Sequence, residues 1–168
     1  MLGRISTVTI TAPDLPVTVA AYQRYLGYRV VDDGALGREM ARAWGRPQMA
    51  GQRAVLLEPE SGAETYLRFV QGPAYVEHEP LSCVGWNAAE LIVQDVDALA
   101  DELTKSPFRI IGQPADLSFS DQIRAMQVVG PSREVLYLTR IKQRLAAFDT
   151  PVAASFVDRV FIVILGGA

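Results

Sequence analysis

The sequence has almost none of the residues that build metal centres and disulfides. Its 168 residues include one histidine, His78, and one cysteine, Cys83. A single cysteine cannot form an internal disulfide, so the fold needs no oxidising compartment. A non-haem iron site of two histidines and one carboxylate cannot be built from one chain either, because it requires a second histidine.

The sequence also lacks a strong excess of either charge and any long apolar run. The net charge is −3 and no basic run is present, so we expect no binding to nucleic acid. The strongly apolar run 160–165 is far too short to cross a bilayer, and the N-terminus has no apolar core of a secretory signal. We therefore expect a cytoplasmic protein that does not bind membranes. A hydrophobic content of 49% is typical of a folded chain.

An internal duplication is the most informative feature of the chain. Segment 7–13 alternates like a strand, Asp14 is typical of a helix start, and Gly27 is typical of a helix end. The same order returns about 80 residues later, with a strand over 88–94 and a second aspartate, Asp95, before a helical pattern. Segments 28–31 and 108–111 match as the next strands.

Each half then offers two further strand-like segments joined by a turn. These segments are 53–57, 64–70, 123–129 and 134–139. Both halves are therefore predicted to run strand, helix, strand, strand, strand, and segment 36–44 is predicted to be a short helix inserted in the first half.

The duplication also predicts how the chain is divided. We expect a first module over 1–76, a linker over 77–83, a second module over 84–142 and a C-terminal extension over 143–168. The extension begins with a basic, helical-looking stretch and ends in the uncharged run 160–165, which is predicted to pair with a sheet edge of its own chain or of a neighbour. Because it looks like the first strand of a third module, the chain could also be part of a longer protein.

Alternation along the predicted strands divides their side chains between two faces. One face is uniformly apolar and should lie under the helices; it consists of Val8, Ile10, Leu67, Phe69, Ala89, Leu91, Val93, Leu136 and Leu138. The other face mixes hydroxyl, aromatic, charged and apolar groups; it consists of Thr7, Thr9, Thr11, Tyr66, Arg68, Val70, Ala88, Glu90, Ile92, Val135, Tyr137 and Thr139. Such a mixed face is either a solvated surface or the lining of a ligand pocket.

The repeated order, with Gly-Pro-Ser-Arg-Glu at 130–134 before the last strand, resembles the vicinal oxygen chelate superfamily. This superfamily includes glyoxalase I, extradiol dioxygenases and bleomycin-resistance proteins, and the resemblance covers roughly residues 5–142. It implies an α+β fold in which two βαβββ modules form an eight-stranded cup around a ligand. It also implies that Thr7, Arg68, Ala88 and Tyr137 stand at the family's metal-ligand positions. Apart from the tyrosine, these are not ligands for transition metals, so we expect neither a metal nor another cofactor.

If the modules close into a cup, Arg68 and Glu90 come from strands near its centre. The planar guanidinium of Arg68 suits bidentate binding of an anionic or carbonyl group. Glu90 is a candidate general base if burial raises its pKa, and Tyr137 is a candidate donor to a developing oxyanion. The alternative is an Arg68–Glu90 ion pair with a purely structural role. The other ligand-binding candidates are Thr7, Thr9 and Tyr66.

The remaining chemistry-bearing residues are weaker candidates. His78 lies in a polar stretch between the halves and is expected to be a solvated linker residue. Cys83 lacks a neighbouring base and is not expected to be a nucleophile. Trp86 opens the second half and is expected in the core or at the rim of a pocket.

Two functions from different classes follow from these residues. The first is a metal-independent isomerase, epimerase or lyase that performs acid–base chemistry next to a carbonyl of a small organic molecule. The second is a protein that sequesters a drug or metabolite without chemistry, as the resemblance to bleomycin-resistance proteins implies. A structural remnant with an active partner domain is a third possibility, because one fold hosts many functions. The resemblance also implies a homodimer.

Overall fold

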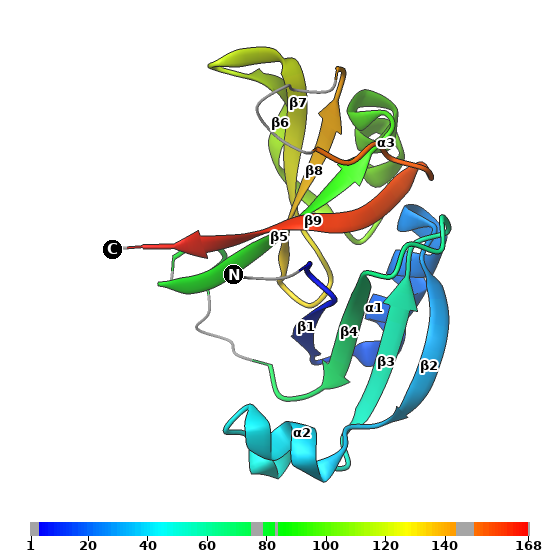
Figure 1. The fold of residues 1–168 in the computed structure, drawn as a ribbon, viewed down its shortest axis with the longest axis vertical. Helices are drawn as coiled ribbons and strands as arrows, with labels where there is room; N and C mark the ends of the chain where they lie inside the picture. The colour runs from blue at the N-terminus through cyan, green and yellow to red at the C-terminus, as the bar shows by residue number, and fades with distance from the viewer. Residues whose placement is uncertain (1–3, 75–78, 83, 144–149, 168) are drawn as a thin grey trace.

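The structure is a computed structural model that describes residues 4–74, 79–82, 84–143 and 150–167. It contains two β-sheets, one from each half of the chain, with helices against them (Figure 1). His78, Cys83 and most of the predicted basic helix over 141–148 lie outside the described residues. No described helix has both the length and the apolar character needed to cross a membrane.

The first half of the chain forms a four-stranded sheet with one long helix. Its elements are β1 (Thr7–Ala12), α1 (Leu15–Leu26), β2 (Arg29–Ala35), α2 (Arg38–Ala43), the 3-10 helix η1 (Pro47–Met49), β3 (Arg53–Glu58) and β4 (Tyr66–Gln71). The strand order is β1-β4-β3-β2, with β1 parallel to β4 and the other neighbours antiparallel. The predicted order of elements is confirmed, including the short inserted helix.

The second half repeats this arrangement and adds a strand. Its elements are β5 (Gly85–Val93), α3 (Val96–Leu103), β6 (Arg109–Leu117), β7 (Ser120–Val129), β8 (Val135–Ile141) and β9 (Val157–Gly166). The strand order is β6-β7-β8-β5-β9, so β5 has a parallel neighbour, β8, and an antiparallel neighbour, β9. The prediction that the uncharged C-terminal run pairs with a sheet edge is confirmed within the chain itself.

Helices α1 and α3 begin at the residues that the sequence indicates, and α1 also ends at the predicted glycine. The Asp14 side chain accepts a hydrogen bond from the backbone N–H of Val17 at 3.1 Å, and Asp95 accepts from Asp97 and Ala98 at the start of α3. Gly27 ends α1 with φ of +66°, a left-handed conformation that favours glycine. Asp14 and Asp95 therefore start a helix at equivalent points of the two modules, directly after the first strand of each.

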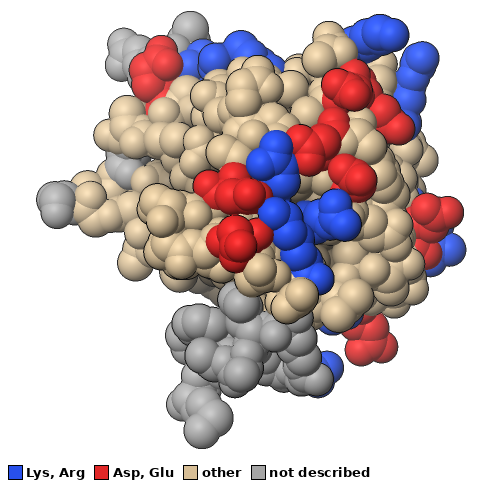
Figure 2. Space-filling view, turned by 90° about the horizontal axis from the view of Figure 1, so that it is seen from above, with Lys and Arg blue, Asp and Glu red and all other residues tan. Residues whose placement is uncertain are grey.

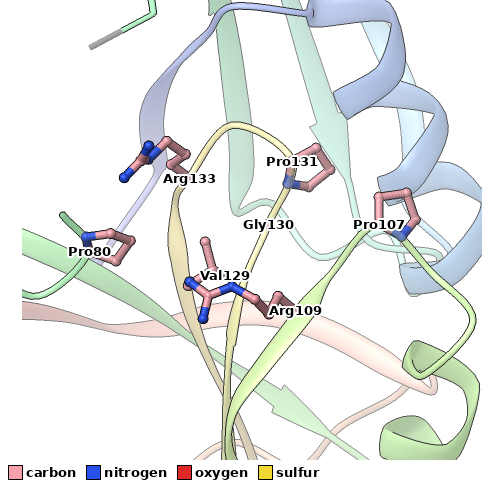
Figure 3. Close-up of a pocket in the computed structure, with 7 residues that line it drawn as sticks. All are labelled: Pro80, Pro107, Arg109, Val129, Gly130, Pro131 and Arg133. Atoms are coloured by element: carbon pink, nitrogen blue, oxygen red, sulfur yellow. The ribbon is translucent and has the colours of Figure 1, made fainter. Parts of the chain in front are cut away.

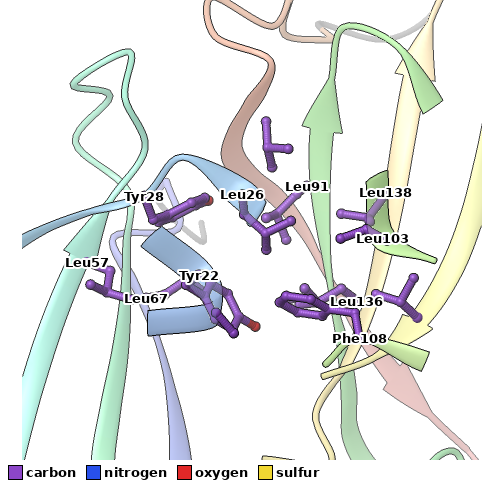
Figure 4. Packing of buried hydrophobic residues seen from close by; sticks show 14 of the residues in the cluster. Tyr22, Leu26, Tyr28, Leu57, Leu67, Leu91, Leu103, Phe108, Leu136 and Leu138 are labelled. Atoms are coloured by element: carbon purple, nitrogen blue, oxygen red, sulfur yellow. The ribbon is translucent and has the colours of Figure 1, made fainter. Parts of the chain in front are cut away.

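The apolar faces of both sheets belong to one common core. All nine residues of the predicted apolar face contribute to it, with Val8 and Ile10 partly buried at its margin. Figure 4 shows Tyr22 and Leu26 of α1 in the space between the two sheets. The Tyr22 ring lies 4.7 Å from Phe69 of the first sheet and 5.5 Å from Phe108 of the second half, centre to centre. The core therefore joins the two modules rather than filling each separately.

The two modules pack through the apolar sides of their sheets. The eight module strands form two sheets with no pairing between them among the described residues, and the core contains the apolar faces of both. The mixed faces therefore lie on the sides of the sheets that are turned away from this core. The physical reason is that both apolar faces need cover, and packing them together around the helices removes both from water.

Polar contacts also join the modules at two places. The Tyr22 hydroxyl donates to Glu134 Oε1 at 2.8 Å, next to a 2.7 Å contact between the hydroxyls of Thr18 and Ser132. Elsewhere, the Tyr28 hydroxyl donates to the backbone carbonyl of Asp158 at 2.8 Å. The relative position of the modules is thus fixed by directional bonds as well as by burial.

Candidate ligand site on the outer face of the second sheet

The outer face of the second sheet carries a row of polar side chains across neighbouring strands. In register, Glu90 of β5 stands beside Tyr137 of β8, which stands beside Gln127 of β7. Gly112 of β6 and Ile162 of β9 complete the row at its two ends. The row thus combines a carboxyl, a phenol and an amide, which can hold a carbonyl compound and exchange a proton with it.

Glu90 is the titratable group of this row. Its carboxyl is half-buried, and the Thr139 hydroxyl donates to Oε1 at 2.7 Å. Burial raises the pKa of Glu90, and the hydrogen bond from Thr139 offsets the rise only in part. A carboxyl in this state holds a proton more readily than an ordinary glutamate, as the sequence-based hypothesis for Glu90 requires.

Gln127 is a member of the row that sequence analysis missed. A Cβ on Gly112 would come within 2.8 Å of Gln127 Oε1, so the glycine leaves room for this side chain beside Tyr137. The signal was present in the sequence, because Gln127 lies between two buried residues, Met126 and Val128, and alternation therefore turns it outward.

Arg68 lies on the other sheet, in different surroundings. Its Nη1 approaches the sulfur of Met40 at 3.3 Å, and its guanidinium lies 5.8 Å from the centre of the Trp44 ring. Both partners belong to the segment of α2, which covers one end of the first sheet's outer face. Among the described residues, Arg68 and Glu90 form no ion pair with each other, so the alternative of a structural Arg68–Glu90 pair is not realised.

The structure thus divides the predicted site residues between two surfaces. Thr7 pairs with Tyr66 and Thr9 with Arg68 on the outer face of the first sheet, whereas Glu90 and Tyr137 are neighbours on the second. Arg68 and Glu90 therefore stand on different sheets. Trp86 is 72% exposed at the start of β5, outside the core.

The positions that the family resemblance assigns to metal ligands do not suit a metal ion. They hold a threonine and an arginine on the first sheet and an alanine and a tyrosine on the second. An arginine repels a cation and an alanine offers no side-chain donor. Among the described residues, no group of three His, Cys, Asp or Glu side chains lies close enough together to bind a metal.

Charged side chains are intermixed on the face of the molecule that Figure 2 shows. The ion pairs of the second half also mix both signs: Arg124 pairs with Asp97 at 2.8 Å and with Asp116 at 3.5 Å, while Lys142 pairs with the same Asp116 at 2.9 Å. Alternating signs of this kind produce no extended field of one sign on this face.

Comparisons with known proteins identify the fold and no close relative. No family model matches the sequence, and no curated protein matches it significantly. A glyoxalase family protein from Bacillus cereus matches in structure with a TM-score of 0.66 and 16% identity, covering 85% of this chain and 97% of that one. A member of the glyoxalase/bleomycin resistance protein/dioxygenase superfamily from Sphaerobacter thermophilus matches with a TM-score of 0.59 and 22% identity, covering 83% and 98%.

A third structure adds a resistance protein to these matches. The fosfomycin resistance protein of Listeria monocytogenes, solved with Mn(II) and sulfate, matches with a TM-score of 0.56 and 12% identity, covering 83% of this chain and 93% of that one. At such low identities the likeness concerns the fold. This chain therefore has the two-module fold of the glyoxalase/bleomycin resistance protein/dioxygenase superfamily.

Proposed function

We propose that this protein binds a small carbonyl compound on the outer face of the second sheet and moves a proton at the carbon next to the carbonyl. Glu90 would take the proton, the carbon–hydrogen electron pair would shift toward the carbonyl oxygen, and the Tyr137 hydroxyl would donate to that oxygen. Return of the proton from Glu90 to a different face or atom gives an epimer or an isomer. Loss of a neighbouring leaving group instead gives elimination.

One observation carries this proposal: Glu90 is half-buried, has a raised pKa and lies in register beside Tyr137. General bases and acids work best when their pKa lies near the working pH, so a raised carboxyl pKa favours this role. The amide of Gln127 fits as a second group that holds the oxygen. No step requires a metal ion, and the proposal includes a cytoplasmic location.

The proposal also includes a homodimer in which Arg68 completes the site from a second copy. Within one chain Arg68 and Glu90 stand on different sheets. The two mixed faces carry complementary halves of the predicted site, Arg68 with Tyr66 on one and Glu90 with Tyr137 on the other. Contact between the first face of one copy and the second face of another would bring these halves together.

Proton transfer can be tested before the substrate is known. The protein would be incubated in D₂O with a panel of 2-oxo acids, 2-hydroxy ketones and β-keto acids, and loss of the α-proton signal followed by NMR. We expect protein-dependent exchange with at least one compound, and Glu90→Gln should slow it by about 100-fold or more. Binding, measured as a rise in melting temperature, should persist in the variant.

The exposed Glu39 of α2 provides the matched control, and Glu39→Gln should keep the wild-type exchange rate. Equal exchange in wild type and Glu90→Gln would exclude Glu90 as the base. A compound that raises the melting temperature without any exchange above the buffer rate would favour sequestration over catalysis.

Mixing two inactive variants tests the shared site. If Arg68 and Glu90 act together across two copies, a mixed dimer of Arg68→Gln and Glu90→Gln contains one intact site. Random mixing should then restore about a quarter of the wild-type rate, because about half of the dimers are mixed. No recovery after mixing, in a sample shown by light scattering to be dimeric, would contradict the shared site.

A further inference from the structure

A concave site lies at the β7–β8 turn, beside the start of β6 (Figure 3). It is an open cavity of about 360 Å³, a size within the range of small-molecule sites. Three prolines, two arginines, a valine and a glycine line it: Pro80, Pro107, Pro131, Arg109, Arg133, Val129 and Gly130. No function assigned above uses these residues.

Arg109 reaches this cavity because of the alternation along β6. The next residue, Ile110, packs against the core, so the Arg109 side chain points to the outer face. Arg109 pairs in register with Val129, which also lines the cavity. Among the described residues Arg109 forms no ion pair, although a free guanidinium has five N–H donors available.

Arg133 supplies a second guanidinium from the turn itself. Its backbone has φ of +64° and its N–H donates to the carbonyl of Gly130 at 2.9 Å, which fixes where its side chain leaves the turn. Glu79 pairs with Arg133 at 3.5 Å, but both side chains are substantially exposed. An exposed pair of this length contributes little to stability.

The chemistry of the lining favours an anion with an apolar body. Prolines have no backbone N–H, and the carboxyl of Glu134 next to the turn is turned inward, where it accepts from Tyr22 and from the backbone of Ser132. Among the residues that line the cavity, the two guanidiniums are therefore the only side chains with polar groups. The pyrrolidine rings and Val129 provide apolar walls around them.

We infer that this cavity binds the carboxylate of a small organic acid, with Arg109 and Arg133 holding the charge and the prolines contacting the apolar part. Guanidinium groups bind planar carboxylates through paired hydrogen bonds. The inference goes beyond the proton transfer proposed for Glu90 and does not require it. The two sites share the outer face, since Val129 is two residues from Gln127 along β7.

Binding of benzoate, measured by titration calorimetry at constant ionic strength, tests the inference. Benzyl alcohol serves as the uncharged analogue and inorganic phosphate as the alternative anion. We expect benzoate to bind, benzyl alcohol not to bind, and phosphate to bind more weakly than benzoate. Arg109→Gln should weaken benzoate binding by about tenfold or more, the usual effect of losing a hydrogen bond between charged groups.

Two variants keep the result interpretable. Arg38→Gln, at the exposed start of α2, removes the same charge from the chain and should leave benzoate binding unchanged. Glu90→Gln should also leave it unchanged, so failure of the catalytic proposal would not affect this one. Equal benzoate affinity in wild type and Arg109→Gln, or equal binding of benzyl alcohol, would overturn the inference. Phosphate binding as tight as benzoate and lost in Arg109→Gln would overturn the assignment to carboxylates.

Discussion

The two modules are joined at two buried carboxylates that differ in their donors. Asp158 of β9 accepts three hydrogen bonds, from the Ser61 hydroxyl at 2.5 Å and from the backbone N–H groups of Ala154 and Arg159 at 2.7 and 2.8 Å. Glu134 of the β7–β8 turn accepts from the Tyr22 hydroxyl and the backbone of Ser132, both at 2.8 Å, and from its own backbone N–H.

Glu134 shows what burial does to such a carboxyl. Burial raises the pKa of Glu134 to about 7, and the hydrogen bonds from its own backbone N–H, from Tyr22 and from Ser132 lower it only in part. These donors do not replace all of the stabilisation that water gives a carboxylate. The comparison teaches that a contact between modules can be well ordered and still weaken as the pH rises.

The largest effect is expected from closing the space that Gly130 leaves for Glu134. An added Cβ would come within 1.9 Å of Glu134 Oε1, so Gly130→Ala should displace the carboxyl from both donors. We expect a loss of about 3 kcal/mol in the free energy of unfolding, measured with urea. Gly37→Ala, where a Cβ meets nothing within 4 Å, is the control and should have little effect. Similar stabilities of the two variants would contradict the tight fit at Gly130.

Glu134→Gln should change how stability depends on pH. The folded-state pKa is raised from 4.5 to about 7, so the stabilisation by Glu134 is fully present below about pH 4.5 and is lost as the pH rises through about 7. Wild type should therefore lose roughly 3 kcal/mol at most between pH 4.5 and 8 through this group. The variant should show a flatter slope, measured by urea unfolding at several pH values.

The exposed carboxyl of Glu102 on α3 gives the comparison for that experiment. Glu102→Gln should keep the wild-type slope between pH 4.5 and 8. A slope in Glu134→Gln that is as steep as in wild type would mean that another group causes the loss of stability at high pH.

The smallest effect is expected at Asp158. Ser61→Ala removes one of three donors to Asp158 and should cost about 1 kcal/mol. Tyr22→Phe removes the hydroxyl that donates to Glu134, whose pKa is raised by burial, and should cost about 2 kcal/mol. Thermal and urea unfolding of the two variants at pH 8 measure the difference. A larger cost for Ser61→Ala than for Tyr22→Phe would reverse the comparison.

Local signals in the sequence predicted most of the fold. Asp14, Gly27 and Asp95 act on neighbouring backbone groups, so their positions indicated where helices begin and end. Alternation within strands correctly identified the apolar face, because it depends only on residues two apart. The same alternation placed Glu90 and Tyr137 on one face before their pairing was known.

Contacts between distant parts of the chain could not be predicted in this way. Tyr22 and Glu134 are 112 residues apart, and no local pattern links them. Alternation defines two faces of a sheet, but it does not say which surface of the other module covers each of them. For that reason Arg68 was expected near Glu90. The sequence placed Arg109 in segment 108–111, the equivalent of strand 28–31, and indicated no binding role for it.

The placement of the two mixed faces on separate sheets has a consequence for how this fold can change. A substitution at an exposed position of one face leaves the common core in place, so each surface can acquire a new specificity at little cost to folding. The insertion of α2 over the first face and the addition of β9 beside the second illustrate such independent remodelling within one polypeptide.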